Sequence, residues 1–225
     1  PQTASVTFDT VPPALPGANV VVIDDADADN NADPFLTSTA GLRILLDWNT
    51  AGDVVAFKVN EAFADCGEPM ERPANIATID SFVKTDFVMS TVDGNHVLFA
   101  CFKDAAGNTV VSSAAAVLDQ VGANGAVVVN GGNAFVTSVA EDVSVVLRMG
   151  EDTARFALSE TVNAACTTPT LNCATASYVN VSGASVVDGA LQQTVSQNLN
   201  GSPAAQGGKC FEACFEDAAG NRTTT

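Results

Sequence analysis

Apolar and polar residues alternate one by one in several short segments of the chain. Residues 42–48 carry an apolar side chain at every second position, and so do 55–59, 143–149 and 154–158. A period of two is typical of a β-strand with one buried face. Clusters of Asn, Asp and Gly, as at 93–95, separate such segments and indicate tight turns. With no helical period of useful length, the pattern predicts an antiparallel, all-β fold.

The same pattern occurs twice along the chain. The string FACFKDAAGN ends at Asn108 and its counterpart EACFEDAAGN ends at Asn221, an offset of 221 − 108 = 113 residues. Earlier in the copies Phe57 matches Phe156, an offset of 156 − 57 = 99. A period of this length corresponds to whole domains, because solenoid repeats are only roughly 20–50 residues long. The 225 residues therefore hold two copies of one domain.

Copies of about 110 residues with about seven alternating strands are typical of an immunoglobulin-like sandwich. The segment VVVNGGNAF at 127–135, with the later CFEDAAGN, resembles bacterial immunoglobulin-like (Big-type) repeats, and VTFDTVPP at 6–13 resembles the leading linker of a sister family. The resemblance implies two tandem immunoglobulin-like antiparallel β-sandwiches, at 11–118 and 119–225. Residues 1–10 would then be an orphan strand and linker.

The resemblance also implies a role. Repeats of this kind form the stalks of adhesins, surface layers and fibres, so we expect a structural protein that is extracellular, at the cell surface or secreted, and no enzyme. A second interpretation is a binding module for carbohydrate or a host surface, with its contacts in the loops 66–86 and 166–209. A viral decoration domain is a third, since such sandwiches occur there too.

Charge narrows the choice of partners. Nine Lys and Arg stand against twenty-six Asp and Glu, giving a net charge of −17. Nucleic acids and anionic membranes need clustered cations, so this balance disfavours both and favours cations or uncharged partners. The longest apolar stretches are far below the roughly 18 residues of a membrane helix, so no membrane insertion is expected. A chain that starts at Pro1 suggests a mature product or a fragment of something longer.

Six cysteines with one histidine favour a disulfide framework over a zinc site, and hence an oxidising compartment. Four cysteines in the second copy allow three connectivities. Aligning the copies selects one set of pairs, namely Cys66–Cys101, Cys166–Cys214 and Cys173–Cys210. Along residues 210–216 the alternation turns Phe211, Ala213 and Phe215 inward. The bridges are therefore expected to pin a long loop to the outside of a sheet.

Acidic and amide side chains at alternate positions form a candidate calcium site. The loop carries its oxygen ligands at Asp24, Asp25, Asp27, Asp29, Asn31 and Asp33. Hard cations such as calcium prefer oxygen ligands of this kind, although the spacing is not that of an EF-hand. A second calcium candidate comprises Asp104, Asn108 and Asp119, near the junction of the copies. The alternative for the loop is a solvated acidic segment, and no other cofactor is expected.

The two copies are out of phase by one strand. After Asn108 the first copy continues to residue 118, whereas the second stops at Thr225, and residues 1–8 precede Asp9 as 111–118 precede Asp119. We therefore expect the second domain to lack its last strand. Residues 1–8, through Ala4, Val6 and Phe8, would fill that place in a neighbour, building a head-to-tail homopolymer. The alternative is a window from a longer array of immunoglobulin-like repeats, with no self-assembly.

A few single residues also invite interpretation. Trp48 continues the inward face of its strand, so core packing is favoured over stacking on a sugar. His96 lacks the sequence context of a catalytic triad and is interpreted as an ordinary strand-edge residue. The sequons at Asn180, Asn200 and Asn221 would matter only in a host with that glycosylation pathway.

Overall fold

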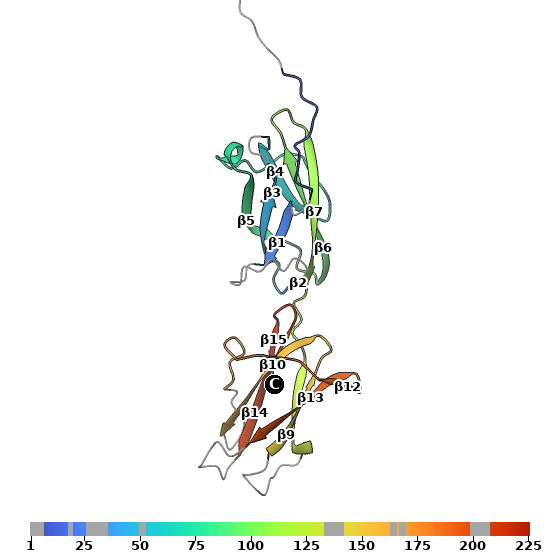
Figure 1. Cartoon of the computed structure of the whole chain (residues 1–225), viewed down its shortest axis with the longest axis vertical. Helices are drawn as coiled ribbons and strands as arrows, with labels where there is room; N and C mark the ends of the chain where they lie inside the picture. The colour runs from blue at the N-terminus through green and yellow to red at the C-terminus, as the bar shows by residue number, and fades with distance from the viewer. Residues whose placement is uncertain are drawn as a thin grey trace, which may run out of the picture. The chain divides into compact units, whose positions relative to one another are not determined.

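The computed structural model describes residues 7–17, 20–25, 36–49, 53–132, 142–162, 166, 170–198 and 208–225. The described chain consists of strands with two short 3-10 turns, η1 (Ile76–Thr78) and η2 (Asn130–Gly132), so the predicted all-β fold is confirmed (Figure 1). The chain divides into two compact units, unit 1 at Pro1–Gln120 and unit 2 at Val121–Thr225. The division falls two residues after the predicted boundary.

Unit 1 is a sandwich of two sheets. The three-stranded sheet has the order β1 (Val21–Asp25), β3 (Gly41–Asp47), β5 (Ser81–Val88). The four-stranded sheet has the order β2 (Leu36–Thr37), β7 (Thr109–Leu118), β6 (Gly94–Lys103), β4 (Ala56–Glu61). Every pairing is antiparallel except that of β2 with the end of β7.

Alternation along β3 fills the core of unit 1. Leu42, Ile44 and Leu46 are at most 1% exposed, as the sequence pattern predicts. Trp48 follows directly and is fully buried, with its ring centroid 6.0 Å from that of Phe57 and 5.9 Å from that of Phe102. Burial of a large apolar side chain stabilises a fold by about 1.5–3 kcal/mol. The interpretation of Trp48 as a core residue is confirmed.

Unit 2 is a sandwich of two four-stranded sheets. One has the order β12 (Ser185–Val187), β13 (Ala190–Asn198), β9 (Asp142–Met149), β8 (Gly125–Val129). The other has the order β11 (Val179–Asn180), β10 (Thr153–Val162), β14 (Lys209–Asp217), β15 (Arg222–Thr224). All pairings in this unit are antiparallel. Both units thus have the two-sheet strand order of an immunoglobulin-like sandwich.

Among the described residues, the core of unit 2 is smaller than that of unit 1. Its fully buried members include Leu147 on β9 together with Ala213 and Phe215 on β14. Phe211 is only partly buried against this cluster. The backbone of β8 passes so close to the Phe215 ring that a Cβ at Gly125 would lie 2.1 Å from it, so only glycine fits there.

The repeated DAAGN string forms the same turn in both units. In unit 1 the Asp104 carboxylate accepts hydrogen bonds from the backbone N–H and the side-chain Nδ2 of Asn108, both at 2.8 Å. In unit 2 Asp217 accepts the same pair from Asn221, at 2.9 and 3.0 Å. An Asp that satisfies the backbone ahead of it is a turn-forming device. The motif is therefore a determinant of the fold.

The turn requires glycine before its Asn. Gly107 and Gly220 have φ values of 97° and 86°, a region that residues with a Cβ avoid.

The same turn also holds the segment that precedes β1. The side-chain amide of Asn108 also donates to the carbonyl oxygens of Asp9 and Val11, at 3.3 Å each. The segment that precedes β1 is thus tied to the turn that precedes β7.

Candidate functional site

Three disulfides tie long loops to the sheets. They join Cys66 to Cys101, Cys166 to Cys210 and Cys173 to Cys214, each with a Cα–Cα distance of 5.5 Å. The predicted Cys66–Cys101 bridge is confirmed. The predicted pairs Cys166–Cys214 and Cys173–Cys210 are wrong.

The direction of the chain after β10 explains the error. Thr161, near the end of β10, pairs with Cys210 at the start of β14, so the chain leaving β10 passes Cys210 first. Cys166, which comes first along the chain, therefore pairs with Cys210, and Cys173 pairs with Cys214. Cys173, rather than Cys166, is the structural counterpart of Cys66.

The bridges lie outside the cores, as the alternation of β14 predicts. Cys101 is 1% exposed and belongs to a small cluster with Ala56 and Met70, against which Cys66 packs. This cluster is separate from the main core of unit 1. In unit 2 Cys210 and Cys214 are buried, yet neither belongs to the core between the sheets. Each bridge therefore lies on the outer face of a sheet.

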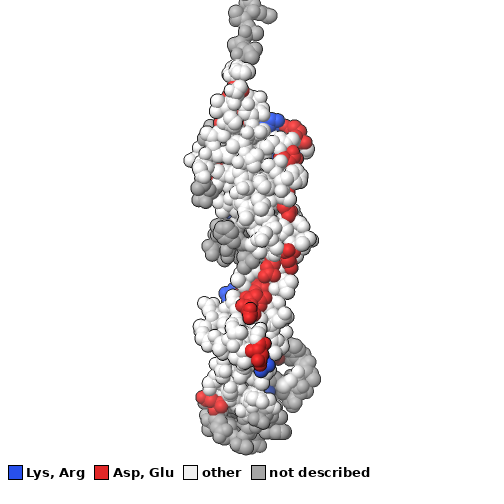
Figure 2. Space-filling model, turned by 90° about the vertical axis from the view of Figure 1, so that its right-hand side faces the viewer, with Lys and Arg blue, Asp and Glu red and all other residues white. Residues whose placement is uncertain are grey.

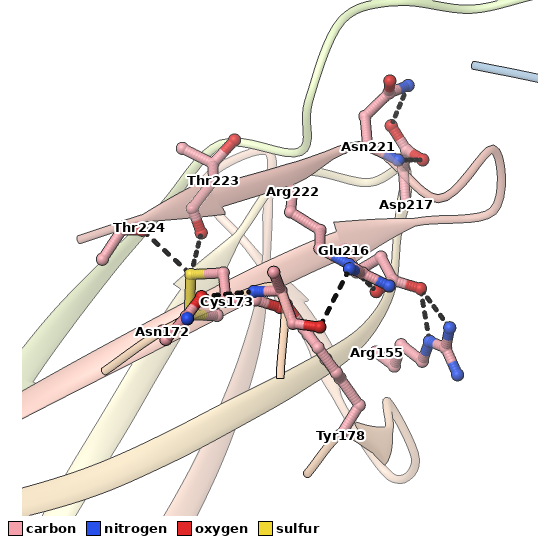
Figure 3. A network of polar contacts seen from close by, with 12 residues as sticks. Arg155, Asn172, Cys173, Tyr178, Glu216, Asp217, Asn221, Arg222, Thr223 and Thr224 are labelled. Carbon is pink, nitrogen blue, oxygen red and sulfur yellow. Dashed lines mark hydrogen bonds and ion pairs between the residues drawn. A yellow bond between two sulfur atoms is a disulfide. The ribbon is translucent and has the colours of Figure 1, made fainter. Parts of the chain in front are cut away.

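A buried carboxylate lies between two arginines beside the stapled loop of unit 2 (Figure 3). The Glu216 side chain is 2% exposed and lies between Arg155 of β10 and Arg222 of β15. Arg222 Nε donates to Oε2 at 2.7 Å, and Arg155 pairs with Oε1. A buried charge is tolerated only with such partners. Both guanidinium groups lie over the ring of Tyr178, 5.4 and 5.6 Å from its centroid.

Tyr178 connects this cluster to a staple. Its hydroxyl donates to the carbonyl oxygen of Cys173 at 3.0 Å, and Arg222 Nη1 donates to that of Ala174 at 3.5 Å. Burial raises the pKa of Tyr178, so the ring stays neutral. The cations, the ring and the disulfide therefore fix one loop on one sheet.

Unit 1 has a basic residue where unit 2 has the acidic Glu216. Lys103 occupies the position of Glu216, since 216 − 103 = 113. Its ammonium lies 3.2 Å from Glu68 Oε1, and Arg72 donates to the same carboxylate at 2.6 Å. Hydrogen bonds from Arg72 and Lys103 lower the pKa of Glu68 to about 2. This cluster is half exposed, unlike that around Glu216.

The candidate calcium ligands fall into three groups. Asp27, Asp29, Asn31 and Asp33 lie outside the described residues, so calcium binding there stays a prediction. Asp24 and Asp25 end β1, where their backbones pair with Arg43 and Leu42. Asp104 and Asn108 satisfy each other in the turn before β7, whereas Asp119 follows the far end of that ten-residue strand, about 33 Å away at the usual rise.

These last three residues therefore do not form one site within unit 1. Over the described ranges, no group of three or more His, Cys, Asp or Glu side chains is placed to hold a metal ion.

The last strand of unit 2, which was predicted to be missing, is present only in its first residues. β15 pairs with Cys214–Glu216, and the backbones of Thr225 and Ala213 exchange hydrogen bonds of 3.0 and 3.1 Å. β15 is three residues long, whereas its counterpart β7 has ten and pairs with β6 throughout. Unit 2 thus has the beginning of this strand.

β15 covers only part of one side of β14. We define the open edge as the backbone N–H and C=O groups of Phe211 and Lys209, which face away from β10 on that side. Successive residues of a strand direct these groups to alternate sides. Because Ala213 faces Thr225, Phe211 and Lys209 face the same way. No strand among the described residues covers them, whereas in unit 1 Leu98 and His96 pair with Ala114 and Ala116 of β7.

The predicted donor residues are only partly described. Ala4 and Val6 lie outside the described residues, and Phe8 lies outside every described strand with 89% of its surface exposed. The residue that matches Phe8 in the repeat, at 8 + 110 = 118, is Leu118, which is 1% exposed.

The visible surface is largely uncharged, and on it Asp and Glu cover more area than Lys and Arg (Figure 2). None of the helices in the described part of the chain has the length and apolar character needed to cross a membrane.

No protein-family model matches the chain, and no curated protein is a significant match. Among solved structures it is similar to the tetra-tandem repeat in the extending region of a large adhesion protein, with 19% identity and a TM-score of 0.27. That match covers 91% of this chain and 47% of the other, so the chain spans less than half the length of its neighbour. At this identity and TM-score the likeness carries no conclusion.

Proposed function

We propose that the chain is a structural module of an extracellular surface protein, in which two immunoglobulin-like sandwiches act as a tandem spacer. The observation that carries the proposal is that each unit fastens its long loop to an outer sheet face by a disulfide and an ion-pair cluster. Disulfides of this kind persist in oxidising compartments. The resemblance of 127–135 and 214–221 to bacterial immunoglobulin-like repeats supports the same role.

A finer proposal concerns how copies join. Residues 3–8 of one copy would add to the open edge of β14 in the next, continuing β15 in the position that residues 113–118 occupy in unit 1. The contrast between Phe8 and Leu118 supports it, because a large apolar side chain that is exposed gains about 1.5–3 kcal/mol on burial. Unpaired sheet edges readily accept a further strand.

Continuation of the same chain in a longer array is the alternative. A strand that followed Thr225 would cover the open edge in the same register, and the chain would then be a stalk without self-assembly. A binding module with contacts in the stapled loops is a third role.

Light scattering and electron microscopy of the oxidised 225-residue chain test the joining step. We expect linear assemblies that disappear when residues 1–8 are deleted and weaken strongly in Phe8→Asp. Phe63→Asp is the matched control, because Phe63 is also exposed, at 65%, but lies outside the donor segment. A full chain that stays monomeric, or a deletion variant that still assembles, excludes head-to-tail joining and leaves the spacer proposal standing.

A glycan array with the same oxidised chain tests the spacer proposal. We expect no saturable binding. A sugar bound in a way that substitutions in the stapled loops abolish would replace the spacer role by a binding role.

A further inference from the structure

His96, the single histidine of the chain, is held between two acceptors. It lies on β6, 7% exposed, with Nδ1 2.6 Å from Glu61 Oε1 on β4 and Nε2 2.8 Å from the carbonyl oxygen of Val92. A neutral imidazole has one N–H, whereas the imidazolium has two. Only the protonated ring can donate to both oxygens, so this geometry matches the charged form.

The ring is linked to the boundary between the units. The other oxygen of Glu61 accepts from the Ser90 backbone N–H at 2.6 Å. Val92 and Asp93 belong to the same β5–β6 loop, and Asp93 Oδ1 accepts from the backbone N–H of Gln120 at 3.1 Å. Gln120 is the last residue of unit 1. The two ends of this loop are therefore held by the His96–Glu61 pair and by the boundary residue.

We infer that His96 is a protonation-controlled latch, which holds the β5–β6 loop and the boundary residue Gln120 in place when the ring is charged and releases them when it is neutral. When the imidazolium loses one proton, one ring nitrogen becomes an acceptor that faces an oxygen acceptor. The hydrogen bond of His96 with either Glu61 or the Val92 carbonyl must then break. Release of Val92 loosens the loop on which Asp93 holds Gln120.

Unit 2 carries a lysine in place of the histidine of this pair. Lys209 and Glu160 occupy the positions of His96 and Glu61, since 209 − 96 = 113 and 160 − 61 = 99. Lys209 Nζ lies 2.8 Å from Glu160 Oε1. An ammonium group only donates hydrogen bonds, whereas an imidazole nitrogen changes from donor to acceptor when it loses its proton. The latch is therefore confined to unit 1.

The groups around His96 determine the direction of the pH effect. Glu61 on β4 is the charged partner, the loop contributes the Val92 carbonyl, and Ala116 of β7, opposite His96, adds no charge. The hydrogen bond with Glu61 raises the pKa of His96, against the opposing effect of burial. Burial raises the pKa of Glu61, but hydrogen bonds from His96 and Ser90 outweigh it and leave that pKa lowered.

The stabilisation therefore has an upper and a lower limit. Since the folded pKa of His96 lies above its unfolded value, stabilisation by the latch is complete below about pH 6.5 and is lost as the pH rises through the folded pKa. Since the folded pKa of Glu61 lies below its unfolded value, the carboxylate's contribution is lost only as the pH falls through that folded pKa, below about pH 4.5.

The intact oxidised chain allows a direct test. One imidazole gives one NMR titration, which we expect above pH ~6.5. Trp48, the single tryptophan, reports denaturant unfolding of unit 1, and Tyr178, the single tyrosine, reports unit 2. From about pH 5.5 to about pH 9 the Trp48 midpoint should fall in the wild type and stay constant in His96→Lys. The Tyr178 midpoint should not show this fall in either protein.

Two further measurements keep the test decisive if His96→Lys does not fold. His96→Gln should match the wild type at high pH and be less stable at low pH. The amide protection of Ser90 and Gln120, corrected for intrinsic exchange, should fall at high pH in the wild type alone. A His96 that titrates at or below about pH 6.5, or Gln120 protection that does not depend on pH, would overturn the latch.

Discussion

Units 1 and 2 share one backbone architecture but differ in the polar residues that support it. Both place a DAAGN turn between the same two strands, and both staple a loop to the outer face of a sheet. They differ in the charges around the staple. Unit 1 places Lys103 where unit 2 places Glu216, and unit 1 leaves its cluster half exposed while unit 2 buries the acid. The backbone architecture is thus retained while the polar chemistry is inverted.

Removing a staple should have the largest effect and tests whether the staples are equivalent. The Cys66–Cys101 and Cys173–Cys214 bridges span 35 and 41 residues, and the chain-entropy relation gives about 4 kcal/mol for either. Replacing both cysteines of either bridge by Ala should lower the free energy of unfolding of its own unit by that amount. Denaturant titration followed at Trp48 for unit 1 and Tyr178 for unit 2 measures it.

The exposed Thr175→Ala serves as the control for these variants and should change either unit by less than about 0.5 kcal/mol. A loss below about 1 kcal/mol for one bridge only would show that the two staples are not equivalent.

The charge clusters should differ in strength. Glu216→Gln removes charged hydrogen bonds from a buried site and should cost unit 2 about 2 kcal/mol, since its arginines are partly exposed and can be rehydrated. Lys103→Gln breaks an exposed pair and should cost unit 1 less than about 1 kcal/mol. Thermal unfolding of the two variants against the wild type compares these costs. Equal costs would show that burial of the carboxylate does not strengthen the cluster.

The smallest difference between the two units is expected at the shared turn. Gly107→Ala and Gly220→Ala should each cost about 1–2 kcal/mol, because both positions have positive φ. Gly17→Ala is the control, since it has open space and no positive φ, and should be nearly neutral. Chemical denaturation of each unit provides the values. A difference of more than about 1 kcal/mol between the two turn variants would show that the turns are not equivalent.

Much of the fold can be predicted from alternation and repetition. The period of two in β3 and β9 places Leu42, Leu147 and their neighbours in the cores correctly. The repeat also places Cys101 and Cys214 on outer faces, because residue parity along a strand determines the face. These features depend on local geometry, which the sequence expresses directly.

Features that depend on the path of a loop were missed. The Cys166–Cys210 bridge follows from where the chain leaves β10, which equal spacing in the alignment does not reveal. The contact of His96 with Glu61 joins residues 35 positions apart. The repeat contained a signal for it, because Lys209 and Glu160 match the pair in the second copy. Comparing charges at equivalent positions would have found it.

The staples also limit how far the chain can lengthen under tension. When unit 1 unfolds with Cys66–Cys101 intact, the sulfur–sulfur bond bypasses the stretch of chain between the two cysteines, whose sequence separation is 35. At about 3.4 Å per extended residue, the unfolded unit is roughly 120 Å shorter than its reduced form. Under a pulling force, a surface spacer built in this way would therefore lengthen less than the same chain without its disulfides.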